Sequence, residues 1–230
     1  MTRSSRPALP VLALAASLLC VATSAGAVPL NNGFSSQNFL DTPLAGTTSA
    51  ARPELAGLVV ADTDTPFSVG GVTGFVQNRV VREWGTGKLD FYWRVELDPS
   101  ANGNSGITAF RLADFGYGYL TDADWRIDGT GTVPSTTARL FNPSAYPQGD
   151  INFLFGTAIE PGQSSEFFFL HTDAVMFKMT ADYDFVNGNN EIGGGGPTYA
   201  PAVPEPAPAA LLALGVLTLA GLRSRRARKA

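Results

Sequence analysis

The chain has 230 residues, and its 16 lysines and arginines and 20 aspartates and glutamates give a formal net charge of −4 at pH 7. Seven of the basic residues lie near the two ends, so residues 28–203 hold 9 basic and 19 acidic side chains and carry a net charge of −10. This acidic body argues against nucleic acid as a partner, because phosphate backbones repel it. A single histidine and a single cysteine, Cys20, exclude zinc sites built from clusters of these two residue types.

A signal peptide is predicted over residues 1–27. Two arginines precede an apolar run at residues 9–21, and Ala25 and Ala27 flank a glycine in a small-x-small cleavage site. Cleavage is expected before Val28, after export through the inner membrane. The one cysteine would leave with this segment, so the mature protein is expected to contain no disulfide.

Residues 28–191 are predicted to form an all-β domain, a two-sheet β-sandwich of jelly-roll type. This stretch is rich in Gly, Pro, Asn and Asp, and its short apolar runs lack helical spacing. No internal repeat occurs at a fixed period, which disfavours a solenoid or a propeller. Strands are expected, in chain order, at residues 55–60, 72–82, 88–97, from 107 onward, and at 151–157, 166–172 and 175–181.

The strand at residues 88–97, KLDFYWRVEL, has the clearest alternation. Period two places Leu89, Phe91, Trp93, Val95 and Leu97 on the core face and Lys88, Asp90, Tyr92, Arg94 and Glu96 toward solvent. The turn-rich loop DPSANGNSG follows, so this strand and the one from residue 107 are expected to form a hairpin. Residues 167–170 are apolar on both faces, which is typical of a central strand covered on two sides.

The sequence does not predict an enzyme. A nucleophilic triad needs an imidazole base, and the one histidine, His171, is interpreted as a structural residue at a strand end. No glycine-rich phosphate-binding loop occurs. A pair of carboxylates would suffice for a glycosidase, and a carboxylate-dependent hydrolase is therefore the enzymatic alternative, although no two acids are linked by the sequence.

Calcium is the one cofactor considered, since it takes oxygen ligands. Asp182, Asp184, Asn187 and Asn189 form a candidate loop, and TDADWRIDG brings three further aspartates together at positions 122, 124 and 128. Neither segment matches the twelve-residue calcium loop. The alternative is that these residues form turns and bond their own backbone.

Four aromatic residues are candidates for stacking against sugar rings: Trp84, Tyr117, Tyr119 and Trp125. A platform of this kind would make the domain a carbohydrate-binding module. The alternative is that these rings pack in the core or in turns.

The last forty residues are predicted to lie outside the domain. Residues 192–203, with four glycines followed by prolines, are expected to form a flexible and then semi-rigid linker. Residues 207–222 are apolar and uncharged, just long enough for a single hydrophobic transmembrane helix. A basic cluster at residues 223–230 follows and would stay on the cytoplasmic side.

The order of these features, from Pro204-Glu205-Pro206 through the apolar helix to Arg223, Arg225 and Arg226, resembles the PEP-CTERM sorting signal of Gram-negative bacteria. Residues 154–174, LFGTAIEPGQSSEFFFLHTDA, are also similar to a segment of some PEP-CTERM exoproteins. The resemblance implies recognition by an exosortase, transient insertion in the inner membrane, and delivery to the envelope or the extracellular space. It also implies a non-enzymatic structural or adhesive role, commonly alongside exopolysaccharide in a biofilm matrix.

Overall fold

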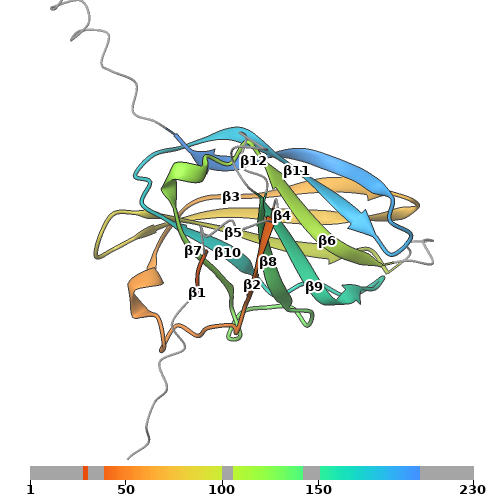
Figure 1. Cartoon of the computed structure of the whole chain (residues 1–230), viewed down its shortest axis with the longest axis horizontal. Helices are drawn as coiled ribbons and strands as arrows, with labels where there is room; N and C mark the ends of the chain where they lie inside the picture. Colours follow the sequence, from red (N-terminus) through yellow and green to blue (C-terminus); the bar gives the residue numbers. More distant parts are fainter. Residues whose placement is uncertain (1–27, 31–38, 100–105, 142–150, 203–230) are drawn as a thin grey trace, which may run out of the picture.

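The computed structural model describes residues 28–30, 39–99, 106–141 and 151–202. Within these residues the chain forms two antiparallel sheets that enclose one hydrophobic core (Figure 1). The predicted two-sheet β-sandwich is therefore confirmed. Two 3-10 turns, η1 (Pro53–Leu55) and η2 (Tyr117–Tyr119), are the only helical segments in the part of the chain that the structure describes.

Each sheet has six strands. Sheet A runs in the order β1 (Val28–Pro29), β7 (Leu120–Trp125), β10 (Phe168–Thr172), β5 (Leu89–Leu97), β4 (Val72–Glu83) and β3 (Gly57–Val69). Sheet B runs in the order β12 (Ile192–Pro201), β11 (Phe177–Asn187), β6 (Ile107–Ala113), β9 (Ile151–Ile159), β8 (Ser135–Phe141) and β2 (Phe39–Pro43).

The expected hairpin between β5 and β6 is wrong, because the two strands belong to different sheets. β5 pairs with β4 and β10, whereas β6 pairs with β11 and β9. Trp93 of β5 instead contacts Phe110 of β6 across the core, with ring centroids 5.8 Å apart. An alternating strand fits a facing sheet as well as a neighbouring strand, so the pattern alone does not distinguish the two arrangements.

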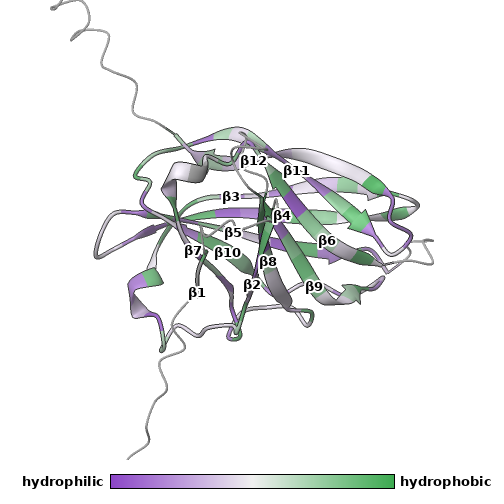
Figure 2. Ribbon diagram, viewed as in Figure 1, coloured by the Kyte–Doolittle hydropathy of each residue, from purple (hydrophilic) through white to green (hydrophobic). Residues whose placement is uncertain are grey.

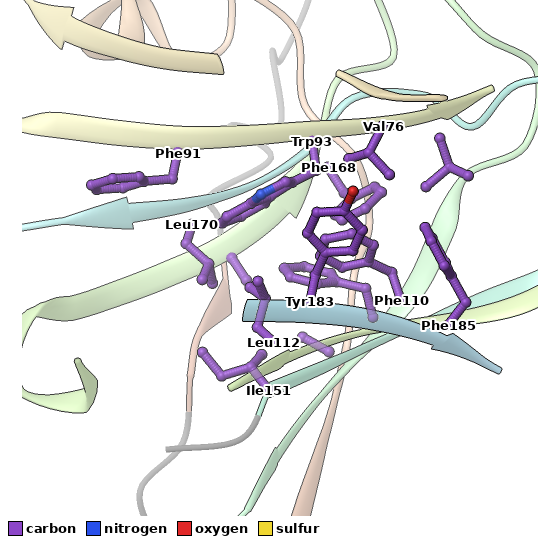
Figure 3. Close-up of a cluster of buried hydrophobic side chains, with 14 of the residues drawn as sticks. Val76, Phe91, Trp93, Phe110, Leu112, Ile151, Phe168, Leu170, Tyr183 and Phe185 are labelled. Carbon is purple, nitrogen blue, oxygen red and sulfur yellow. The ribbon is translucent and has the colours of Figure 1, made fainter. Parts of the chain in front are cut away.

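Trp93 lies at the centre of the core and is 1 % exposed. Its ring contacts Phe110 of sheet B and Phe168 of sheet A (Figure 3). It also contacts Phe153 of sheet B. Along β6, Figure 2 shows the change between polar and apolar residues that directs one side of the strand into this core. Aromatic pairs at these separations add to the free energy of burial.

The outer face of sheet A, which points away from sheet B, carries a second small core. It is built from Leu55, Val81, Tyr92, Phe167 and Phe169. Leu55 comes from residues 44–56, a stretch that we name the covering segment. The run at residues 167–170 is buried on both sides, as predicted, since Phe168 and Leu170 belong to the main core.

The covering segment also corrects the prediction for β5. Leu89, Phe91, Trp93, Val95 and Leu97 are buried as expected, but Asp90 and Tyr92 are not in solvent and are only 0 % and 4 % exposed. The alternation correctly assigned them to the other face. It carried no information about a segment elsewhere in the chain that covers that face.

The predicted linker at residues 192–203 is wrong for most of its length, because residues 192–201 form the edge strand β12 and pair with β11. The glycines allow close approach: a Cβ on Gly195 would lie 2.4 Å from the carbonyl oxygen of Tyr183. Thr198 of this strand accepts a hydrogen bond from the Trp93 indole at 2.8 Å and donates one to Asn78 at 2.8 Å. The folded domain therefore extends to residue 202.

Most of the predicted targeting residues lie outside the described residues. These are Ala25 and Ala27 of the cleavage site, Pro204, Glu205 and Pro206 of the tripeptide, the helix at 207–222, and Arg223, Arg225 and Arg226. Val28 is described, and its backbone pairs with that of Ala123 in β7. Among the described residues no helix has the length and apolar character needed to cross a membrane.

Candidate functional site

A groove of about 620 Å³ lies on the outer face of sheet A, beside the covering segment. Its lining comes from β3, β4 and β5, from the end of the covering segment and from the loop after β7. A second hollow of about 320 Å³ shares Gln77 and Arg94 with it and continues along the same face to Phe75. The groove residues that enter the argument below are Gln77, Arg79, Trp84, Tyr92, Arg94, Arg126, Asp128, Thr130 and Phe167.

The register of β4 against β5 places the polar side chains of the groove. Gln77 lies opposite Arg94, and Arg79 lies opposite Tyr92. The guanidinium carbons of Arg79 and Arg94 lie 4.8 and 5.6 Å from the centre of the Phe167 ring. Cation–π contacts of this kind hold both guanidinium groups against the floor of the groove.

Each of these arginines also has an acidic neighbour. Arg79 pairs with Asp62 at 2.7 Å and Arg94 with Glu96 at 2.8 Å. Arg94 donates a further hydrogen bond to Thr130 at 2.9 Å, but its Nε atom is buried without a partner. The floor of the groove thus keeps a hydrogen-bond donor that the protein itself does not satisfy.

Tyr92 and Asp128 extend this polar lining. The Tyr92 hydroxyl is buried, and burial raises the pKa of this phenol although Arg126 acts in the opposite direction. Burial also opposes ionisation of Asp128, but hydrogen bonds from Ser49 and Arg126 outweigh it and lower the pKa of Asp128 to about 2. Asp128 is therefore ionised at neutral pH and holds Arg126 at 2.9 Å.

Trp84 forms part of the groove wall and is 76 % exposed. A large apolar side chain this exposed loses contact with water when a flat apolar partner covers it. The structure therefore places one of the four predicted stacking residues in a groove.

The predicted platform as a whole does not form. Trp125 packs against the main core from β7, on the opposite face of sheet A from Trp84. Tyr119 is half-buried in η2, and the side chain of Tyr117 is not described. For Trp125 the alternative of core packing is therefore confirmed. Trp84 lies in the groove without Trp125 beside it.

The sequence did not single out the groove arginines. Arg79 and Arg94 lie on the solvent-facing set of two alternating strands, and that signal was present in the sequence. Their convergence depends on the β4–β5 register and on Phe167, the residue before β10. No local sequence pattern contains either relation.

The four predicted calcium ligands do not make a shared ligand set. Asp184 pairs with Arg111 at 2.5 Å on sheet B. Asn187 is buried, and its Oδ1 accepts the backbone N–H groups of Asn189 and Glu191 at 3.0 and 2.9 Å. Asp182, at the outer surface of β11, is exposed. For Asn187 the alternative of a turn-forming side chain is confirmed.

The other acidic run, at residues 120–129, anchors the covering segment. Asp122 binds the Arg52 guanidinium at 2.9 and 3.2 Å. Asp124 accepts the N–H of Gly46 at 2.8 Å, and Asp128 accepts the N–H of Ser49 at 2.6 Å. Each of the three aspartates thus holds a different point of the same segment.

A second group of polar residues lies on the outer face of sheet A and shares no residue with the groove lining. Asp90 and His171 are opposite each other in β5 and β10, and Glu83 ends β4. His171 Nδ1 lies 2.7 Å from Asp90 Oδ1 and 3.1 Å from Glu83 Oε1. The ligand atoms of the three residues lie within 4.8 Å of one another, so the group has the composition of a metal site.

Burial and charge act in opposite directions on these residues. Burial raises the pKa of Asp90 to about 6, although the hydrogen bond to His171 works against it. Burial alone would lower the pKa of His171, but its contacts with Asp90, and the charges of Asp122 and Glu83, raise it. The histidine is thus tied to buried acids at a strand end.

Catalytic chemistry has no support from the groove itself. Among the described residues that line it, Asp128 is the one carboxylate, whereas glycoside hydrolysis uses two flanking carboxyl groups. In the adjoining hollow, Glu96 is paired with Arg94. Glu83 and Asp90 are close together, but they are 2 % and 0 % exposed, so no sugar reaches them.

Comparison of the chain with protein-family models, with curated proteins and with solved structures gave no match in any of the three searches.

Proposed function

We propose that this protein is an exported, non-enzymatic adhesive component of the cell envelope or extracellular matrix, and that its groove on sheet A binds a saccharide such as exopolysaccharide. The observation that carries the proposal is the position of Trp84, 76 % exposed, in the wall of a groove lined by arginines. Sugar rings combine an apolar face with a rim of hydroxyl groups. A site for them therefore needs an aromatic surface beside hydrogen-bonding groups.

The groove supplies both kinds of group from rigid elements. Arg79, Arg94 and Gln77 come from paired strands, and Phe167 fixes the two guanidinium planes. The Gln77 amide and the guanidinium groups of Arg79 and Arg94 line the groove and would donate to ligand oxygen atoms. Because the second hollow continues along the same face, an extended polymer suits the surface better than a single sugar.

Export and sorting rest on the sequence. The proposed course is removal of residues 1–27, transient insertion of the C-terminal helix in the inner membrane, and processing by an exosortase near Pro204-Glu205-Pro206. Mass spectrometry of the protein from envelope and supernatant fractions tests this course. We expect a mature form that starts at Val28 and lacks residues 223–230. A mature form that keeps Arg225 to Lys229 would show an ordinary membrane anchor instead.

Binding at the groove is tested by titrating the protein with the exopolysaccharide of the producing cells and following tryptophan fluorescence. Trp93 is 1 % exposed and Trp125 packs against the main core outside the groove, so a change on binding comes mainly from Trp84. We expect Trp84→Ala to weaken binding by tenfold or more, which corresponds to about 1.4 kcal/mol.

Met179→Ala is the matched control, because Met179 is an exposed apolar residue, 46 % accessible, on sheet B. Calorimetry should give wild-type affinity for this variant. Equal affinities of Trp84→Ala and wild type would contradict the groove as the binding site. Absence of binding to every polysaccharide on a glycan array would contradict the saccharide as the ligand.

A further inference from the structure

We propose that Glu83, Asp90 and His171 bind one divalent transition-metal ion, and that Zn²⁺ is the ion their ligand set fits best. The site lies at the ends of three adjacent strands, β4, β5 and β10. It adjoins the groove, since Glu83 precedes Trp84, but it shares no residue with the groove lining, and the proposal does not depend on saccharide binding.

The two distances from His171 Nδ1 to the acids are close to those in the coordination sphere of a small ion. Metal–ligand bonds of about 2.1 Å place neighbouring ligand atoms about 3.0–3.4 Å apart in octahedral or tetrahedral geometry. The distance from His171 Nδ1 to Glu83 Oε1, 3.1 Å, lies in this range. The distance from Nδ1 to Asp90 Oδ1, 2.7 Å, needs to open by a few tenths of an ångström when an ion replaces the shared proton.

Two buried carboxylate oxygens in this group have no hydrogen bond. His171 Nδ1 carries at most one N–H, which Asp90 Oδ1 accepts, and Glu83 Oε1 is left without a donor. Asp90 Oδ2 also has no partner. A buried carboxylate oxygen without a donor costs a large part of its hydration free energy, so these two atoms point to a missing partner.

The charge balance indicates that this partner is a cation. Glu83 and Asp90 bring two carboxylates into the interior with one imidazole. The Arg52 guanidinium, whose charge acts on Asp90, is already bound to Asp122 and Glu54. Lys88 pairs with Asp173, and Thr86 donates to the other Glu83 oxygen, Oε2. A divalent ion would neutralise both acids at once.

The ligand types select the ion. An imidazole disfavours Ca²⁺ and Mg²⁺, which prefer oxygen ligands throughout, and the absence of thiolate disfavours Cu⁺. One histidine with two carboxylates is within the ligand range of Zn²⁺. The 12 % exposure of the His171 side chain leaves one side of the site for a water ligand.

The covering segment determines how the ion enters. Asp90 is 0 % exposed, and Arg52 and Leu55 of the covering segment lie over the outer face beside it. Loading is therefore expected during folding, with slow exchange afterwards. A chelator added to the folded protein would act slowly, so refolding is the appropriate way to exchange the ion.

The test uses the exported domain with a tag that contains no histidine. Protein is refolded from urea with Zn²⁺ or with EDTA, passed through a desalting column, and measured by elemental mass spectrometry and thermal unfolding. We expect about one zinc ion per chain, a higher melting temperature in Zn²⁺ than in EDTA, and no such rise with Ca²⁺. Asp90→Asn and His171→Gln should each weaken zinc binding by at least about tenfold.

Asp184→Asn is the control, because it removes a paired carboxylate on the other sheet and should keep wild-type zinc content. Wild-type protein that refolds equally well in EDTA and retains no zinc would overturn the proposal without any variant being needed. Full zinc content in both Asp90→Asn and His171→Gln would also overturn it. Co²⁺ substitution adds a spectroscopic measurement: a visible absorption band that His171→Gln alters places the ion on this imidazole.

Discussion

Asp122, Asp124 and Asp128 show how similar residues close together in a sequence can have unrelated partners. Their spacing resembles an acidic ligand loop. In the structure each carboxylate holds a different residue of the covering segment, namely Arg52, Gly46 and Ser49. All three aspartates bind the covering segment. Their side chains are distributed along β7 and the turn after it, so they do not converge on one ion.

Asp128 gives a prediction about pH. Its pKa in the folded protein is about 2, below the ordinary value of 3.8, so its contribution to stability is complete above about pH 4 and is lost as the pH falls through 2. We expect Asp128→Asn to lower the free energy of unfolding by about 1 kcal/mol at pH 6. Urea unfolding at pH 6 and at pH 2 measures this, and an equal loss at both values would contradict it.

Asp90 and Tyr92 show what alternation along a strand can and cannot predict. It gives the face of the sheet on which a side chain lies, but not whether that face is exposed to solvent. The period of two placed them correctly on the face opposite Trp93, and the residues chosen for the core were confirmed. Whether that second face meets water depends on Leu55 and Arg52, which lie some forty residues earlier in the chain. The proposed metal ligands were missed for the same reason, because Glu83 and His171 come together only through the pairing of β4 and β10 with β5.

Among the elements, β12 changes the boundaries of the domain most. Its glycines and prolines read as a linker, yet the backbone pairs with β11 over most of its length. Gly195 passes close to the Tyr183 carbonyl, and Thr198 binds the central tryptophan. A glycine run is thus compatible with an edge strand wherever neighbouring backbone or rings occupy the space of a side chain.

Truncation tests the role of β12. A chain that ends at residue 202 should fold, whereas one that ends at residue 191 should lose cooperative unfolding. Removing the strand leaves the Trp93 indole without its acceptor and exposes the edge of β11. Circular dichroism and limited proteolysis distinguish the two chains. Equal protease resistance of the two chains would show that residues 192–202 are not needed for the fold, as expected of a linker.

Strands with strong apolar alternation, such as β4, β5 and β9, were found from the sequence to within a few residues. β7, with the sequence LTDADW, was not, because its acids suggest a loop and its pairing with β10 compensates for them only in the folded sheet. The groove depends on the same kind of long-range pairing. Among the residues that line the groove, sequence analysis identified Trp84 but missed Arg79, Arg94 and Arg126.

For the whole molecule, the negative net charge conceals a local concentration of basic side chains. Residues 28–203 carry a net charge of −10, yet three of their nine basic side chains, Arg79, Arg94 and Arg126, line a single groove. The composition correctly gives the negative charge of the domain as a whole, but it does not indicate this basic groove. The sandwich concentrates them because one face of sheet A collects the outward side chains of several strands.

The end of β12 sets a distance that matters for any enzyme acting on the tail. Ala202 is the last described residue and donates its N–H to Met176 at 2.9 Å, and only Val203 separates it from Pro204. One extended residue spans about 3.5 Å, far less than the width of a folded domain. The proposed processing at this tripeptide would therefore take place within a few residues of the folded strand. Under that proposal, the enzyme would act either at the surface of the sandwich or before β12 has paired with β11.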